Sequence, residues 1–367
     1  MRILLVNTSP DWGGGEAWAL ATATALRRRG HAVGIAAAPH SVLASRARTA
    51  GIEMEAVPPS PFGRWASTRR LRAWIAAQAP DVAIANAGPD VRRMAWLLRG
   101  RRTARILRRG LDRPLQSDAW HRAQYRRLDA ILANSAATRR TVLASCTAVA
   151  PEHVGVVHNG LDTAAFLEFA PLDVRGKFGI PPEAPVIGIV GRLTRQKAHA
   201  VAFAAFQQVK AAIPQAHLLV VGSGEDEEAL HTEARRLGIE PHFTGEVHPV
   251  QPYYAACDLI VVPSWFEGFC YVAAEAQLLQ RPVVASNASS LPEIVLERAT
   301  GLLVPPGDVA AFTAAIVQLA SDPERCARMG QAGQAHVQAH FDDQVVVTRL
   351  EAFLGDASRW VEERRRA

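Results

Sequence analysis

Short, continuous apolar runs alternate with longer amphipathic stretches along the whole chain. In the first half the apolar runs are RILLVN (2–7), HAVGIAAA (31–38), IEMEAV (52–57), DVAIANA (81–87), ARILRR (104–109), AILANS (130–135) and VGVVHNG (154–160). In the second half they are VIGIVG (186–191), HLLVVGSG (217–224), HFTG (242–245), LIVVPS (259–264), PVVAS (282–286) and GLLVP (301–305). Runs of this length predict strands, and the stretches between them predict helices.

The order of these elements predicts the fold. Strands that are apolar at nearly every position are typical of a parallel sheet covered on both faces. Regular alternation of strand and helix predicts an α/β, doubly wound architecture. Two such series, separated by a polar, proline-bearing stretch at 163–185, predict two Rossmann-like domains at 1–163 and 164–341. The last helix, 342–367, is expected to pack back on the first domain.

The chemistry of such a fold is expected at one edge of each sheet. In open α/β sheets, ligands bind beyond the carboxyl ends of the strands. We therefore expect the two parallel sheets to face a central cleft that holds the ligands.

Composition narrows the class of protein. A chain of 367 residues that is 49% hydrophobic is long enough for two cores. Its four scattered cysteines form no CxxC pair, so neither a disulfide framework nor a structural zinc site is indicated. No run of 18 apolar residues occurs, and the first apolar run is too short for a signal peptide. These features favour a cytoplasmic location.

Charge is distributed unevenly between the two halves. The first 165 residues carry 24 arginines against 11 acidic residues, a net charge of +13, whereas the remaining residues carry a net charge of −7. A basic first half suits an anionic partner, although a preference for arginine on an ordinary solvated surface would give the same count.

The first candidate ligand loop is PDWGGGE (10–16), between the first strand and the first helix. Gly13, Gly14 and Gly15 let a ligand approach the backbone, and a helix N-terminus offers N–H donors. The loop lacks the GxGxxG pattern, and no acidic residue ends the second strand, so a dinucleotide site is poorly supported. A tight turn without a ligand is the plain alternative.

The second candidate is GRLTRQKAH (191–199), which follows a predicted strand. Arg192 and Lys197 in this loop could neutralise a diphosphate, the arginine with its planar fork of donors and the lysine as a compact charge. Two solvated surface cations are the alternative interpretation.

The third candidate is SWFEGFCYVAAEAQ (264–277), in which a helix is expected to begin at Gly268. The backbone N–H groups of Gly268, Phe269 and Cys270 would suit a phosphate, and Glu267 could reach the hydroxyls of an adjacent sugar. Glu275 follows about 10 Å further along the helix, which suits a ribose. Its apolar neighbours make an idle carboxylate costly, so two plain surface glutamates are the weaker explanation.

Two glutamates separated by seven residues, together with GRL and a lysine five residues after the arginine, resemble the family 4 retaining glycosyltransferases of GT-B fold. The motifs GGGE (13–16), NGLD (159–162), GSGED (222–226), SLPEIV (290–295) and TGLLVPPGD (300–308) agree with this resemblance, which covers nearly the whole chain. It implies that the second domain binds a nucleotide-sugar donor and that the first binds the acceptor.

The resemblance also implies roles for individual residues. The catalytic set would be Arg192, Lys197 and Glu267. The donor would be bound by Gly14, Gly15, Gly268, Phe269, Cys270, Glu275 and Val247, the last in the GEVHP stretch (245–249) that would line the base pocket. Transfer would retain the anomeric configuration and require no cofactor. The sequence has no DxD motif, so the enzyme is expected to work without a metal.

One departure from the family pattern concerns RRGLDRPL (108–115). Related enzymes often have a histidine where Arg109 stands, and that histidine contacts the donor sugar. Arginine cannot act as a general base at neutral pH, so Arg109 would bind a hydroxyl or an anionic group instead. Asp112 and Glu16 would contact the acceptor or the sugar, and His121 is a candidate substitute for the missing histidine or a structural residue.

Arginine and tryptophan alternate in STRRLRAW (67–74), VRRMAWLLRGRRTARILRR (91–109) and HRAQYRR (121–127). This pattern suits docking to the anionic inner face of a bacterial inner membrane or binding of a phosphorylated or lipid-linked acceptor. No nucleic-acid-binding motif accompanies it, so no nucleic-acid partner is expected.

These observations predict a glycosyltransferase that builds a cell-envelope glycan or glycolipid, such as lipopolysaccharide, from a UDP- or GDP-linked sugar. Two other functions fit the fold: a non-catalytic nucleotide-sugar-binding protein and an NAD-dependent oxidoreductase with twin Rossmann domains. The intact charged motifs count against the former, and the missing dinucleotide pattern counts against the latter. The base, the sugar and the acceptor are not determined by these motifs.

Overall fold

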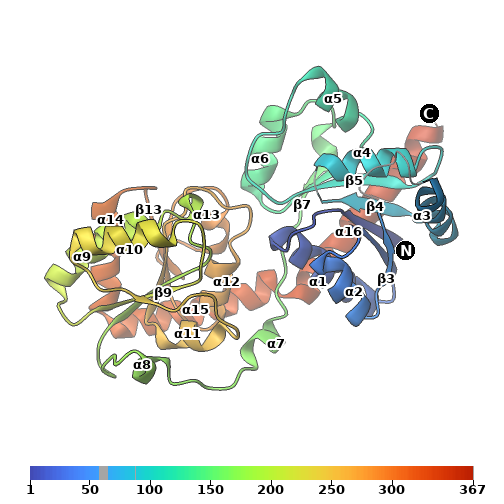
Figure 1. The fold of residues 1–367 in the computed structure, drawn as a ribbon. Coiled ribbons are helices and arrows are strands. Elements are labelled where there is room, and N and C mark those ends of the chain that lie inside the picture. Colours follow the sequence, from blue (N-terminus) through green and yellow to red (C-terminus); the bar gives the residue numbers. More distant parts are fainter. Residues whose placement is uncertain (58–64, 87, 367) are drawn as a thin grey trace. The chain divides into compact units, whose positions relative to one another are not determined.

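The computed structural model describes residues 1–57, 65–86 and 88–366, which divide into two compact units (Figure 1). Unit 1 comprises Met1–Gly160 and Asp343–Ala367, and unit 2 comprises Leu161–Asp342. Each unit contains one parallel sheet with helices on both faces. The predicted α/β class with two Rossmann-like domains is therefore confirmed.

Unit 1 has a seven-stranded sheet in the order β3-β2-β1-β4-β5-β6-β7. Its strands are β1 (Arg2–Asn7), β2 (Ala32–Ala37), β3 (Glu53–Ala56), β4 (Val82–Ala85), β5 (Ala104–Arg109), β6 (Ala130–Ala133) and β7 (Val154–Val156). Its helices are α1 (Gly14–Arg28), α2 (Val42–Thr49), α3 (Trp65–Gln78), α4 (Gly88–Leu97), α5 (Ala119–Tyr125), α6 (Ala136–Ser145), the 3-10 turn η1 (Pro151–His153) and α16 (Asp343–Arg366).

Unit 2 has a six-stranded sheet in the order β10-β9-β8-β11-β12-β13. Its strands are β8 (Val186–Val190), β9 (His217–Val221), β10 (His242–Phe243), β11 (Leu259–Val262), β12 (Val283–Ser286) and β13 (Gly301–Val304). Its helices are α7 (Thr163–Leu167), α8 (Val174–Lys177), η2 (Arg195–Lys197), α9 (His199–Ala212), α10 (Glu227–Leu237), α11 (Gln251–Ala256), α12 (Tyr271–Leu278), α13 (Leu291–Ile294), α14 (Val309–Ala320) and α15 (Pro323–Phe341).

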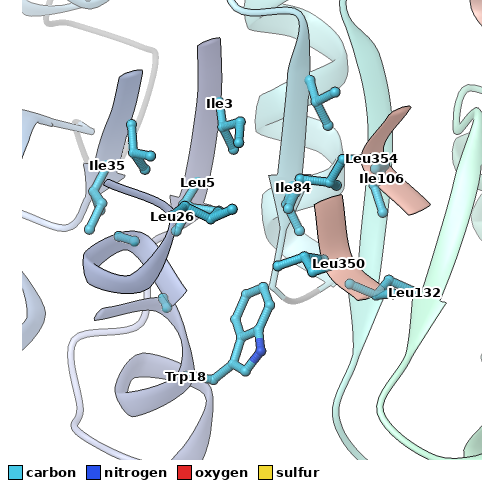
Figure 2. Packing of buried hydrophobic residues seen from close by; sticks show 14 of the residues in the cluster. Ile3, Leu5, Trp18, Leu26, Ile35, Ile84, Ile106, Leu132, Leu350 and Leu354 are labelled. Atoms are coloured by element: carbon cyan, nitrogen blue, oxygen red, sulfur yellow. The ribbon is translucent and has the colours of Figure 1, made fainter. Parts of the chain in front are cut away.

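Strand β1 shows why the apolar runs are continuous. Ile3 and Leu5 pack on one face of the sheet with α1, α2 and α16, as Figure 2 shows for the surrounding side chains. Leu4 and Val6 pack on the other face with α3, α4 and α6. Successive side chains of a strand point to opposite faces, so a sheet covered twice requires apolar residues at every position.

Helix α16 supplies part of the core of unit 1, although it follows all of unit 2 in the sequence. Leu350 and Leu354 are buried beside Ile84 and Ile106 of the sheet (Figure 2). Burial of a leucine side chain stabilises a fold by about 2 kcal/mol. Glu351 of the same helix accepts hydrogen bonds from Arg29 at 2.7 Å and from His31 at 2.8 Å. Helix α16 is thus an integral part of unit 1.

Candidate functional site

The loops that follow β8 and β9 touch backbone to backbone at the carboxyl edge of the unit 2 sheet. The N–H of Gly191 donates to the carbonyl of Val221 at 2.9 Å, and the N–H of Leu193 donates to that of Ser223 at 2.9 Å. Gly222 has φ 127°, and a Cβ added there would lie 2.1 Å from the carbonyl oxygen of Gly191. Only glycine fits this crossing, which fixes the course of the segment carrying Arg192 and Lys197.

Lys197, which is partly buried, and Glu267, which is buried, form an ion pair at this edge. The Lys197 ammonium lies 2.6 Å from Oε1 of Glu267, and the Ser264 hydroxyl donates to the same oxygen at 2.8 Å. Burial lowers the pKa of Lys197, but the neighbouring Glu267 carboxylate more than offsets this and leaves the pKa raised. Lys197 therefore carries its positive charge at neutral pH.

Two further hydrogen bonds, one from a side chain and one from the backbone, hold the segments of this pair together. The Gln196 side-chain amide donates to the carbonyl of Phe266 at 2.8 Å, and the N–H of Trp265 donates to the carbonyl of Gln196 at 3.0 Å. The loop after β8 is thereby fastened to the loop after β11. The positions of Lys197 and Glu267 do not depend on the ion pair alone.

Arg192 belongs to the same electrostatic site. Its side chain is exposed, and it forms no hydrogen bond or ion pair with any residue in the described ranges. Its charge lowers the pKa of Lys197, which places the two cations within electrostatic reach of each other. An exposed guanidinium beside a fixed ammonium is suited to an anionic ligand.

Helix α12 begins at Tyr271, so the prediction that it begins at Gly268 was wrong. Phe269 and Cys270 are buried, and the Phe269 ring packs 5.4 Å from that of Phe341. Because these side chains enter the core, the backbone of Cys270 is extended, with φ −91° and ψ 94°. Cys270 is therefore the N-cap residue of α12 and not part of the helix. Burial raises the pKa of the Cys270 thiol to about 12, which keeps it neutral.

Glu275 lies one turn inside α12 and is held by a residue from α11. The Tyr254 hydroxyl donates to Oε2 of Glu275 at 2.8 Å, and Tyr254 itself is fully buried. Burial raises the pKa of the Glu275 carboxyl, whereas the bond from Tyr254 and the charge of Lys197 oppose this rise. Lys197 therefore acts electrostatically on Glu275 and forms an ion pair with Glu267.

The segment that follows β10 borders the same loops. The N–H of Gly222 donates to the carbonyl of Gly245 at 2.9 Å, and Gly245 has φ 69°. Val247 is partly buried against the apolar cluster that contains Tyr254 and Phe269. The structure thus brings Val247 to the edge that carries the charged residues.

In unit 1, the glycine loop opens α1 beside the end of β4. The helix begins at Gly14, and a Cβ on Gly15 would lie 2.5 Å from the side-chain nitrogen of Asn86. A Cβ on Gly14 would meet nothing within 4 Å. Glu16 is buried in the first turn. A side chain at Gly15 would therefore have to displace Asn86, whereas Gly14 borders open space.

Arg108, which the sequence arguments did not single out, is the buried cation of this edge. Its guanidinium donates to the side-chain oxygens of Asn86 and Asn159, each at 3.0 Å, and stacks 4.2 Å from the centre of the Trp18 ring. Arg108 is two residues after Ile106 on β5, so both side chains point to the same face of the sheet. Because Ile106 is buried on that face, a buried side chain is expected at Arg108 as well.

The neighbouring Arg109 points to the other face and holds its own loop. Its guanidinium donates to the carbonyl of Arg113 at 2.8 Å, and burial lowers its pKa. Asp112 accepts a hydrogen bond from the Thr141 hydroxyl. His121 is bonded to Asp118, the residue that caps α5, which is a structural contact.

Comparison with known proteins adds the decisive observation. Residues 12–165 match the family described as "Glycosyltransferase Family 4", and residues 184–322 match "Glycosyl transferases group 1".

The chain belongs to glycosyltransferase family 4.

The family 4 chain is similar to several curated bacterial proteins. It is 36% identical to D-inositol 3-phosphate glycosyltransferase of Segniliparus rotundus over 196 residues, which are 51% of this chain and 43% of that relative. It is 34% identical to the GDP-mannose-dependent monoacylated alpha-(1-6)-phosphatidylinositol monomannoside mannosyltransferase of Corynebacterium glutamicum over 213 residues, 55% of this chain and 56% of that relative. The chain spans about half the length of these relatives.

Solved structures share the fold of the family 4 chain. HepE of Anabaena in complex with UDP superposes with a TM-score of 0.83 at 23% identity, covering 97% of this chain and 100% of that chain. A glycosyltransferase of Rickettsia africae gives a TM-score of 0.85 at 16% identity, covering 97% of this chain and 98% of that chain. Within the part of the family 4 chain that the structure describes, every helix is too short or too polar to cross a bilayer.

Proposed function

We propose that this protein is a retaining, metal-independent glycosyltransferase that uses a nucleotide sugar. The observation that carries the proposal is the Lys197–Glu267 pair at 2.6 Å, with Arg192 beside it, at the carboxyl edge of the unit 2 sheet. A charged ammonium and an exposed guanidinium meet the negative charge that grows on a departing nucleoside diphosphate. The backbone N–H groups at the start of α12 add to this stabilisation.

The two glutamates have separate tasks in this proposal. Lys197 and Ser264 both bond to Oε1 of Glu267, which leaves Oε2 to accept hydroxyls of the transferred sugar. Tyr254 holds the Glu275 carboxylate for the paired hydroxyls of a ribose. In this proposal Val247 lies beside the nucleoside base.

The donor test follows from the donors of related proteins and of proteins with the same fold. One relative is named as GDP-mannose-dependent, and HepE has been crystallised with UDP-glucose at 23% identity to this chain. We therefore expect one UDP- or GDP-sugar in a panel to raise the unfolding temperature and to be turned over in the presence of EDTA. The anomeric configuration of the product, read by NMR, should match that of the donor. If no nucleotide sugar of either base binds, the proposed function is wrong.

The acceptor in this proposal is a phosphorylated or lipid-linked glycan of the cell envelope, approached at the inner face of the membrane. Trp96 and Trp120 are 42% and 53% exposed. The guanidinium of Arg72 lies 5.2 Å from the Trp96 ring, and that of Arg92 lies 4.8 Å from the Trp120 ring. Exposed tryptophans paired with arginines suit the boundary between lipid headgroups and acyl chains.

A further inference from the structure

The amino edge of the unit 1 sheet carries a second concentration of charge. Two adjoining hollows lie there, of about 810 Å³ and about 170 Å³, and they share Arg101, Thr103 and Val361. Their described lining residues include eight arginines and three carboxylates, a balance of +5. The arginines come from the starts of β1 and β5, from the segments after α4 and α5, and from α16.

The carboxylates of the hollows do not neutralise these arginines. Asp81 pairs with Arg2 at 3.3 Å, and Asp129 pairs with Arg364 at 2.9 Å. The ends of α3, α4, α5 and α16 lie at this edge and favour cations, but each helix end is equivalent to only about half a negative charge. Four ends supply about −2 against the balance of +5, so positive charge is left over.

Several guanidinium donors at this edge have no acceptor within the described ranges. Among the described residues, Arg102, Arg126 and Arg127 form no side-chain hydrogen bond or ion pair, and all three are exposed. Arg105 uses one terminal nitrogen on the carbonyl of Arg127, while its Nε is buried without a partner. A buried donor that lacks a partner is costly unless a ligand or water satisfies it.

From these observations we propose that the two hollows bind a ligand with two or more adjacent phosphate groups. Arginine forks bind phosphate oxygens in pairs, whereas an apolar ligand would desolvate these charged groups without pairing them. This site is separate from the candidate active site, because Arg105 and the carboxyl end of β5 are separated by most of a six-residue strand, or about 13 Å. It lies beyond the proposed transfer reaction and does not depend on it.

The test uses inorganic tripolyphosphate as the probe and the whole chain as the protein. Binding is measured by calorimetry at low salt, and its place is located by hydrogen exchange. Protection is expected at residues 100–106 and 358–366, in addition to any protection at the loop 191–197. The Arg102→Ser/Arg126→Ser variant should bind tripolyphosphate in the hollows at least about tenfold more weakly than the wild type. This is a loss of about 1.4 kcal/mol in binding free energy.

The matched control is Arg48→Ser/Arg140→Ser, which removes the same charge from exposed positions of unit 1 outside the hollows. It should retain the wild-type affinity, and thermal unfolding should show that both double variants fold. An equal loss in both double variants, or protection confined to 191–197, would overturn the proposal.

A vesicle arm identifies the source of the phosphate. Vesicles of phosphatidylinositol phosphate in phosphatidylcholine are added in place of tripolyphosphate. Protection of 100–106 that the Arg102→Ser/Arg126→Ser variant loses supports a lipid headgroup as the ligand. Protection by tripolyphosphate without protection by vesicles supports a soluble oligophosphate.

Discussion

The carboxyl edges of the two sheets are built from the same architecture but hold their charged groups differently. In unit 2, Lys197 is held by the carboxylate of Glu267, and Glu275 is held by the Tyr254 hydroxyl. In unit 1, Arg108 contacts two amide oxygens and an indole ring, all of them neutral groups. The unit 2 contacts fix an ammonium and two carboxylates at one edge, whereas the contacts of Arg108 in unit 1 fix a guanidinium beside the glycine loop.

The strongest test of this difference is Lys197→Met. The substitution leaves Glu267 buried without its counter-ion, which should cost about 3 kcal/mol of stability. It also removes a cation from the leaving group, so transfer should fall about a hundred- to a thousandfold. Denaturant unfolding and initial rates measure the two effects. Lys210→Met, which removes an ammonium bonded to the Pro214 carbonyl, is the matched control. Wild-type turnover in Lys197→Met would refute the assigned role.

The glycine loop of unit 1 offers a matched pair of variants. Gly15→Ala drives a methyl group to 2.5 Å from Asn86 and thereby disturbs the contact with Arg108, so we expect a loss of about 2 kcal/mol in unfolding free energy. Gly14→Ala meets no atom within 4 Å and should leave stability nearly unchanged. Urea denaturation compares the two. Equal stabilities would show that the loop does not depend on packing against Asn86.

Tyr254→Phe removes the bond to Glu275 and leaves the ring in the core. We expect the affinity for the nucleotide to fall about tenfold, because a hydrogen bond to a charged group contributes about 1.5–3 kcal/mol. Tyr254 is a positioning residue, so KM for the donor should rise more than kcat falls. The dissociation constant of the nucleotide and a full rate profile measure this split. A fall in kcat alone would contradict it.

Glu275→Gln should stabilise the protein while weakening the binding of nucleotide. Burial raises the pKa of Glu275 above its ordinary value of 4.5, so the folded state holds this proton more tightly than the unfolded state. Stability therefore falls as pH rises between the ordinary and the raised pKa. Glutamine does not ionise, so the variant does not lose stability in this way. Its free energy of unfolding at neutral pH should be about 1 kcal/mol higher than that of the wild type. Unfolding measured from pH 4 to 8 tests the slope, and an identical slope in both proteins would refute the argument.

The smallest effect concerns the membrane proposal for unit 1. Arg92→Ser should weaken retention on vesicles rich in anionic lipid about fivefold at low salt, since one basic residue near such a surface contributes about 1 kcal/mol. Arg48→Ser, on the other face of the sheet, is the control and should change retention less. Sedimentation with vesicles measures the fraction bound. If the wild type does not sediment at all, membrane docking is excluded.

The sequence was sufficient for the elements but not for their side-chain partners. The strand runs predicted both sheets, and the spacing of Arg192, Lys197, Glu267 and Glu275 identified residues that meet at one edge. The partnership of Tyr254 with Glu275 joins two helices, and no local pattern encodes it. The start of α12 at Tyr271 depends on Phe269 and Cys270 entering the core, which a helical pattern cannot reveal. Arg108 could have been found, because it shares the strand face of Ile106.

The placement of α16 has a consequence for synthesis on the ribosome. Unit 2 is continuous from Leu161 to Asp342, so its whole core is available once that segment has emerged. Unit 1 begins to emerge first, yet it lacks Leu350 and Leu354 until the last helix is made. The half that is translated first is therefore completed last, and during translation it exposes the apolar groove that α16 later fills.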